Sequence, residues 1–151
     1  MERELLDADK ALEQKSEIAI LTKGISMRPM LREHRDVVIV ERVNRPLKAG
    51  DVPLYRVAGR EEFVLHRIVK CTKNGYVIRG DNLLSNEYNV KDSDIIGVLK
   101  ACYRDGVYFD CATSRKYKLY SLYIRLSFPL RKLWRLKVRP ILSKIKHTVF
   151  K

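Results

Sequence analysis

The sequence has no aspartate or glutamate after Asp110, although the chain continues to Lys151. Twelve of its 31 Lys and Arg residues lie in this acid-free stretch, so the first 110 residues carry 19 basic and 18 acidic residues. The net charge of +13 therefore belongs to the C-terminal part. Such a segment is typical of proteins that bind an anionic lipid surface, a nucleic acid or an acidic protein.

The sequence also lacks a long apolar run. No stretch of about 18 consecutive apolar residues occurs, so we expect no helix that spans a membrane. The first residues, Met1 to Asp7, contain neither the basic region nor the apolar segment of a secretory signal. We therefore expect a cytoplasmic protein without a signal peptide.

Cysteine is scarce and is not arranged for cross-linking or for metal binding. The number of cysteines is odd, and Cys71, Cys102 and Cys111 form no CxxC motif. Both facts argue against a disulfide framework and a zinc site. We expect them to be small, buried apolar residues. His34 and His147 lack ligand spacing, so we predict no metal and no cofactor.

The apolar pattern predicts a mainly β domain. The chain is 151 residues long and 46% apolar, which suits one hydrophobic core. Hairpin signals stand at 74–75 and 105–106, Pro53 predicts an edge strand or a bulge, and 80–90 reads as a polar loop. Strands are predicted at 18–22, 36–40, 52–57, 62–70, 76–79, 95–103 and 107–112. Many short strands joined by turns indicate a coiled sheet or small barrel, preceded by a short helix over 2–14.

The character of the sequence changes at Ser114, so we divide the chain into 1–113 and a basic helical tail over 114–151. Apolar residues recur at helical spacing in this tail, and Pro129 and Pro140 are expected to break it into short helices. Its aromatic residues are candidates for a membrane interface: Tyr120, Tyr123, Phe128 and Trp134. We favour an anionic membrane surface as the partner of 115–151, ahead of a helical tail packed on the body or bound to a protein, and rank nucleic acid last.

A serine stands at a predicted strand exit. Gly24-Ile25-Ser26-Met27-Arg28-Pro29-Met30 follows the apolar strand and bends the chain sharply. Serines in such turns are commonly turn residues, so this motif alone does not indicate catalysis.

Further motifs follow the serine in a set order. They are Gly50-Asp51-Val52, Leu65-His66-Arg67-Ile68-Val69, Gly80-Asp81-Asn82 and Ile95-Ile96-Gly97. In this order and over residues 18–99, the sequence resembles the type I signal peptidase superfamily of serine peptidases, which also includes self-cleaving repressors. The resemblance implies a coiled β fold and cleavage of a peptide bond in a peptide or protein substrate.

The resemblance implies a role for each motif. Ser26 would be the nucleophile and His66 its base, as in the histidine-type members, and the pKa of an imidazole suits that task. Asp81 would orient the histidine, but these members carry an aspartate pair five and six residues further on, where this chain has Asn86 and Glu87. Glu87 is therefore a second candidate for the orienting carboxylate.

The same resemblance implies how substrate would bind. An extended peptide would add to exposed strands beside the serine, with Met27, Pro29 and Leu65 close to it. The enzyme expected is a serine endopeptidase that removes a leader or signal-like segment. The alternatives are a catalytically inactive peptide-binding module and, ranked last, a self-cleaving repressor.

Overall fold

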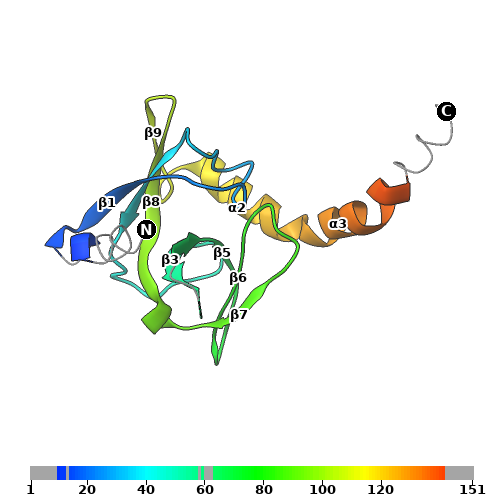
Figure 1. Cartoon of the computed structure of the whole chain (residues 1–151), viewed down its shortest axis with the longest axis horizontal. Helices are drawn as coiled ribbons and strands as arrows, with labels where there is room; N and C mark the ends of the chain where they lie inside the picture. Colours follow the sequence, from blue (N-terminus) through cyan, green and yellow to red (C-terminus); the bar gives the residue numbers. More distant parts are fainter. Residues whose placement is uncertain (1–9, 13, 58, 60–62, 142–151) are drawn as a thin grey trace.

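The computed structural model describes residues 10–12, 14–57, 59 and 63–141. It is mainly β, with a strongly curled, half-closed sheet and helices at the C-terminal end (Figure 1), as predicted. Residues 10–12 and 14 are helical, and Leu12 is buried in the core; the rest of the helix predicted over 2–14 lies outside the described residues.

The larger sheet is built around its longest strand, β8 (Ile95–Arg104). Its strand order is β1-β2-β8-β3-β4, and β9 also pairs with β8, all antiparallel. The other bounds are β1 (Glu17–Leu21), β2 (Val37–Glu41), β3 (Pro53–Arg56), β4 (Phe63–Leu65) and β9 (Val107–Asp110). Within the described residues, β1, β4 and β9 each pair with one strand and are therefore the edge strands of this sheet.

The smaller sheet has the order β5-β6-β7, with β5 (Arg67–Thr72), β6 (Gly75–Arg79) and β7 (Glu87–Val90). The strand predicted over 62–70 is thus two strands that join different sheets, and they meet at His66. The polar loop predicted over 80–90 ends in a strand, β7, because residues 87–90 pair with β6. The hairpins at 74–75 and 105–106 form as predicted.

Pro53 shows both what the sequence predicted and where it failed. β3 is not an edge strand, because it lies between β8 and β4. Pro53 begins the strand and precedes the part that pairs with β4, so its missing N–H breaks no ladder. An irregularity in register with β8 follows directly, between Leu54 and Tyr55, as the bulge prediction required.

Two apolar clusters fill the space inside the curled sheet. The alternation of β4 and β5 divides their side chains between the clusters, with Val64 and Ile68 in one and Leu65 in the other. Cys102 and Cys111 are buried in the larger cluster, as predicted, whereas Cys71 is exposed.

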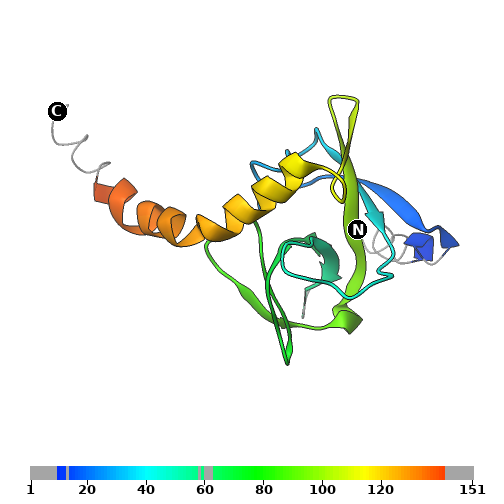
Figure 2. The same ribbon diagram turned by 180° about the vertical axis from the view of Figure 1, so that it is seen from behind.

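The helical tail begins at Arg115, with Ser114 as the N-cap, and runs away from the sheets (Figures 1 and 2). It comprises α2 (Arg115–Leu126), α3 (Phe128–Leu133) and a wide π-helical segment, η2 (Trp134–Val138). The break before Pro129 was predicted. The break at Pro140 was wrong, because residues 139–141 remain helical directly after the π segment.

The tail has two faces of different character. Tyr120 and Phe128, predicted as interfacial aromatics, face the body: the Tyr120 hydroxyl donates to Asp81, and Phe128 lies beneath the Arg79 guanidinium. We call the opposite side the outer face; its large side chains are 44–71% exposed. They are Leu119, Leu122, Tyr123, Leu126, Leu130, Leu133 and Trp134.

A buried ion pair joins the smaller sheet to α2. Arg67 on β5 donates from Nε and Nη2 to the two carboxylate oxygens of Asp81, each at 2.8 Å, and both side chains are 1% exposed. Arg67 also donates to the carbonyl of Gly50 and to Tyr117 and Ser121 of α2. Burial alone would lower the pKa of Arg67, but the bonds and charge of Asp81 outweigh it, so the guanidinium stays charged.

We expect this ion pair to control stability. Asp81→Ala should lower the free energy of unfolding by about 3–5 kcal/mol, because it strands a buried guanidinium. The double variant Arg67→Leu/Asp81→Leu should lose less than the sum of the single variants, since it leaves no unpaired charge. Urea unfolding measures each value.

Arg35→Ala serves as the control for this cycle, because the Asp105–Arg35 pair lies on the surface. Its effect should be small. Additive losses at Arg67 and Asp81 would contradict the assignment of the pair as one coupled unit.

Candidate active site

Hydrogen bonds hold the loop that carries Ser26, both between its two ends and from Arg104 on β8. The Thr22 hydroxyl donates to the carbonyls of Arg32 (2.7 Å) and Asp36 (2.9 Å), which closes the loop on itself. Asp36 is fully buried and accepts from the backbone N–H of Arg32 and from the Arg104 guanidinium, each at 3.0 Å. Arg104 also donates to the Met30 carbonyl, so the loop has little freedom to shift.

Ser26 follows a sharp bend and is half-buried. Gly24 has φ +78°, a left-handed conformation that favours glycine, which explains the glycine of the motif. A turn follows, closed by the Arg28 N–H on the Ile25 carbonyl at 3.2 Å. The Ser26 hydroxyl forms no hydrogen bond with any of the described residues.

Gly80 is where the serine loop and the histidine strand meet. The Ser26 carbonyl accepts from the Asn82 N–H at 2.7 Å, and a side chain at Gly80 would come within 2.8 Å of that carbonyl. Glycine is therefore needed for this close approach. His66 directly precedes β5 and Gly80 directly follows β6, at the end of the hairpin where Arg67 pairs with Arg79, so both residues lie at the same end of this strand pair.

His66 is buried, 5% exposed, and bonded through one ring nitrogen. Its Nδ1 lies 3.0 Å from Oε1 of Glu87 and 3.2 Å from the Tyr55 hydroxyl. A carboxylate only accepts hydrogen bonds, so Nδ1 carries the proton and donates to Glu87. Nε2 is then the basic nitrogen; it is buried, and it has no hydrogen-bond partner among the described residues.

Burial lowers the pKa of His66 below its ordinary value of 6.5, and the charges of Glu87 and Asp81 offset only part of that effect. The ring is therefore neutral at pH 7, the state that a general base requires. Burial and Glu87 raise the pKa of Tyr55, which keeps it a phenol that hydrogen-bonds the same carboxylate.

The structure distinguishes the two carboxylates that the sequence left open. Glu87 contacts His66, whereas both oxygens of Asp81 bind Arg67, so Asp81 does not orient the ring as predicted. The reason is that His66 and Arg67 are consecutive. Neighbouring side chains of an extended chain point to opposite sides, so each of the two contacts a different carboxylate.

The predicted substrate-binding residues lie in different environments. Met27 is buried in the larger apolar cluster, Pro29 is exposed and Leu65 is half-buried on the edge strand β4. Both strands suggested for substrate addition, β1 and β4, are edges within the described residues.

Sequence reasoning missed two groups at the site. Tyr55 lies eleven residues before His66, and nothing in its strand pattern marks it as polar-bonded. Arg67 was assigned no role of its own. An arginine next to a histidine in an apolar strand, followed by an aspartate in a later glycine loop, is a sequence pattern that could have indicated a buried ion pair.

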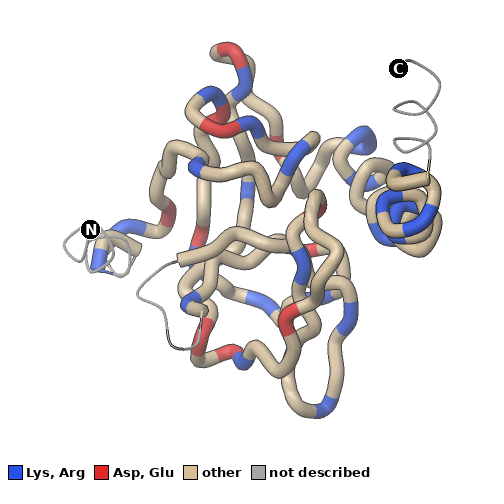
Figure 3. The backbone as a smooth tube through the Cα atoms, turned by 45° about the vertical axis from the view of Figure 1, so that its right-hand side comes forward, with Lys and Arg blue, Asp and Glu red and all other residues tan. Residues whose placement is uncertain are grey.

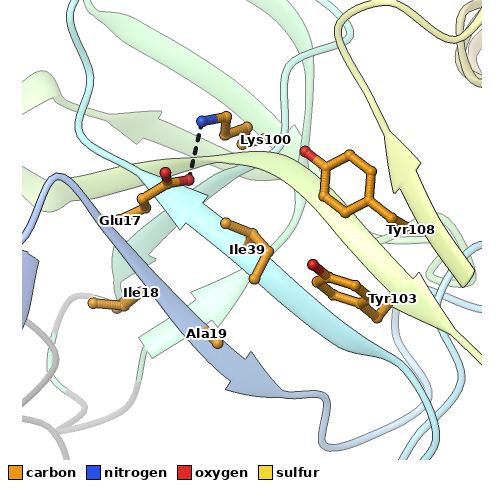
Figure 4. Close-up of a pocket in the computed structure, with 7 residues that line it drawn as sticks. All are labelled: Glu17, Ile18, Ala19, Ile39, Lys100, Tyr103 and Tyr108. Carbon is orange, nitrogen blue, oxygen red and sulfur yellow. Dashed lines mark hydrogen bonds and ion pairs between the residues drawn. The ribbon is translucent and has the colours of Figure 1, made fainter. Parts of the chain in front are cut away.

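A shallow hollow lies away from this site, on the face of the larger sheet (Figure 4). The Lys100–Glu17 ion pair spans one side, and the rings of Tyr103 and Tyr108 stand at the other. No residue of the Ser26 or His66 environment lines it. In the part of the chain that the structure describes, no group of three or more His, Cys, Asp or Glu side chains could hold a metal ion.

The chain matches no protein-family model, and no curated protein sequence matches it significantly.

The histidine should titrate below its ordinary pKa. In an NMR titration, we expect the imidazole of His66 to protonate below pH 6.5, and we expect Glu87→Gln to lower that midpoint further, since Glu87 raises it. The fold should lose stability as the pH falls from 6.5 toward this lower pKa, because the unfolded chain binds the proton first.

Glu41→Gln, on the distant strand β2, is the matched control and should leave the His66 midpoint unchanged. An upward shift in Glu87→Gln would contradict the contact between Glu87 and Nδ1.

Proposed function

We propose that this protein is a serine endopeptidase that removes a leader or signal-like segment from a peptide or protein. One observation carries the proposal: the buried, neutral His66 has Nδ1 bonded to Glu87 and a buried Nε2 without a hydrogen-bond partner among the described residues, and it lies at the end of the β5–β6 pair where the Gly80 loop contacts Ser26. This is the arrangement of base and orienting carboxylate that activates a serine.

In the proposed reaction, Nε2 of His66 takes the Ser26 proton as Oγ attacks the carbonyl carbon of the scissile peptide. The new imidazolium, stabilised by Glu87, gives that proton to the leaving amine as the C–N bond breaks. Water, deprotonated by Nε2, then hydrolyses the acyl-enzyme and restores the serine. The two side chains are not hydrogen-bonded without substrate, as is common in the apo state of such sites.

An extended substrate would add to an exposed strand edge near the serine. β4 is favoured over β1 because it leads directly into His66, so a peptide paired with it would pass the base. Leu65, half-buried at the end of β4, would then lie beside the bound chain.

The second candidate is a peptide-binding module that has kept the fold without catalysis. The absence of a Ser26–His66 hydrogen bond within the described residues favours it. Under this alternative, the edge strands still bind an extended peptide but the serine is unreactive.

We also propose that the helical tail lies on an anionic membrane surface. The outer face presents exposed leucines with Tyr123 and Trp134, and the same helices carry Lys and Arg but no Asp or Glu (Figure 3). Apolar side chains beside cations, with no acidic residue, suit the interface of a negatively charged bilayer. No helix in the described part of the chain is long and apolar enough to cross one.

An active-site probe tests the peptidase. A fluorophosphonate should label the wild type at Ser26; Ser26→Ala should abolish labelling, and His66→Ala should slow it roughly 10³-fold or more. Mass spectrometry of the labelled peptide locates the modified residue. Ser93→Ala, on a distant turn, should label at the wild-type rate.

An unlabelled wild type that still binds extended peptides would support the binding module instead. Labelling that survives Ser26→Ala would refute the assigned nucleophile.

Vesicle flotation tests the membrane proposal. Leu130→Glu should weaken binding to phosphatidylglycerol vesicles roughly tenfold, because it replaces an exposed apolar anchor with a repelled charge. Val107→Glu, equally exposed on β9, should have little effect. Equal loss in both variants, or equal binding to neutral phosphatidylcholine, would contradict a specific anionic docking face.

A further inference from the structure

The loop Gly80-Asp81-Asn82 supports the serine from one side. The Asn82 N–H donates to the Ser26 carbonyl at 2.7 Å, and its side-chain Nδ2 donates to the Ile25 carbonyl at 3.1 Å. Two consecutive backbone carbonyls of the serine turn, those of Ile25 and Ser26, therefore accept hydrogen bonds from the same asparagine. Any shift of Asn82 would move the backbone that carries the Ser26 hydroxyl.

Two arginines of the helical tail donate hydrogen bonds to the same loop from its other side. Arg131 donates from Nη1 to the Asp81 carbonyl at 2.8 Å. Arg135 donates from Nη1 to the Asn82 carbonyl at 2.7 Å and from Nη2 to Asn82 Oδ1 at 2.5 Å. They stand four residues apart, so they share one helix face, the face turned to the body.

Arg135 decides which way the Asn82 amide points. A guanidinium only donates, so it selects Oδ1 and leaves Nδ2 to donate to the Ile25 carbonyl. Without Arg135, Oδ1 would lose its donor and only the single bond from Nδ2 to the Ile25 carbonyl would restrain the amide. The arginine therefore acts on the serine turn through one side chain.

The Arg131 side chain is itself held in position by hydrogen bonds within the tail. Its Nη2 donates to the Ile124 carbonyl at 2.8 Å, and its Nε donates to the Ser127 hydroxyl at 3.1 Å. The neighbouring cations Lys137 and Arg139 are exposed. Among the described basic residues of the tail, Arg131 and Arg135 bind the loop, Arg125 is half-buried, and the others are exposed.

We propose that Arg135, braced by Arg131, is a positioning residue that holds Asn82 against the serine turn and so sets the reactivity of Ser26. The proposal rests on the proposed peptidase function for its effect on rate. The physical link itself, from Arg135 through Asn82 to the Ser26 backbone, is testable without any activity.

The experiment uses the full chain without lipid and compares Arg135→Ala with Arg139→Ala. Both variants remove one arginine from the same helical segment, but Arg139 is exposed. Arg135→Ala should slow fluorophosphonate labelling of Ser26 about tenfold and speed hydrogen exchange of the Asn82 amide, whereas Arg139→Ala should change neither. Melting temperatures should stay close to the wild type in both.

Asn82→Ala completes a double-mutant cycle. If Arg135 acts through the asparagine amide, the combined loss of labelling rate in Arg135→Ala/Asn82→Ala should be clearly smaller than the product of the single losses. If the combined loss of labelling rate equals the product of the single losses, Arg135 does not act through the asparagine amide. If hydrogen exchange at the Asn82 amide is unchanged in Arg135→Ala, Arg135 does not hold the loop at all. If wild-type Ser26 fails to label, the peptidase proposal fails, while the exchange measurement still decides the positioning role.

Discussion

The charge pair between Arg67 and Asp81 is the interaction on which the arrangement of this molecule depends. Two full charges are removed from water, and they are tolerated because each carboxylate oxygen has its own donor and the guanidinium has further acceptors in Gly50 and α2. The pair ties β5, the Gly80 loop and the first tail helix together. His66 directly precedes Arg67, and the Ser26 carbonyl lies close to Gly80, which directly precedes Asp81. The ion pair therefore helps to position both residues of the candidate site.

Around this pair, charge is used in two ways. The body contains nearly balanced charges that bond one another or the backbone, as Asp36 and Arg104 do beneath the serine loop. The charged residues of the tail are all Lys or Arg; Arg131 and Arg135 bind backbone carbonyls of the body, and several others are exposed. One face of the tail therefore contacts the Gly80 loop, and the outer face is the one that we propose to lie on an anionic surface.

The local structure was largely readable from residue order. Alternating and β-branched segments predicted most strands, and the dipeptides at 74–75 and 105–106 predicted their hairpins, because turn chemistry acts over two residues. β7 was missed because its pairing with β6 overrides a polar sequence. Pro140 was misjudged because a wide π turn before it accommodates the missing donor.

The sequence by itself determined the mainly β fold and the basic tail, since these rest on composition and periodicity, and its resemblance to a peptidase superfamily suggested the candidate pair Ser26 and His66. Only the tertiary structure decided that Glu87 and not Asp81 bonds His66, that Tyr120 faces the body, and that Arg135 reaches Asn82. These contacts join residues 21 to 53 positions apart. A side chain's partner at such separations is set by strand register and helix phase, and both depend on packing of the whole chain.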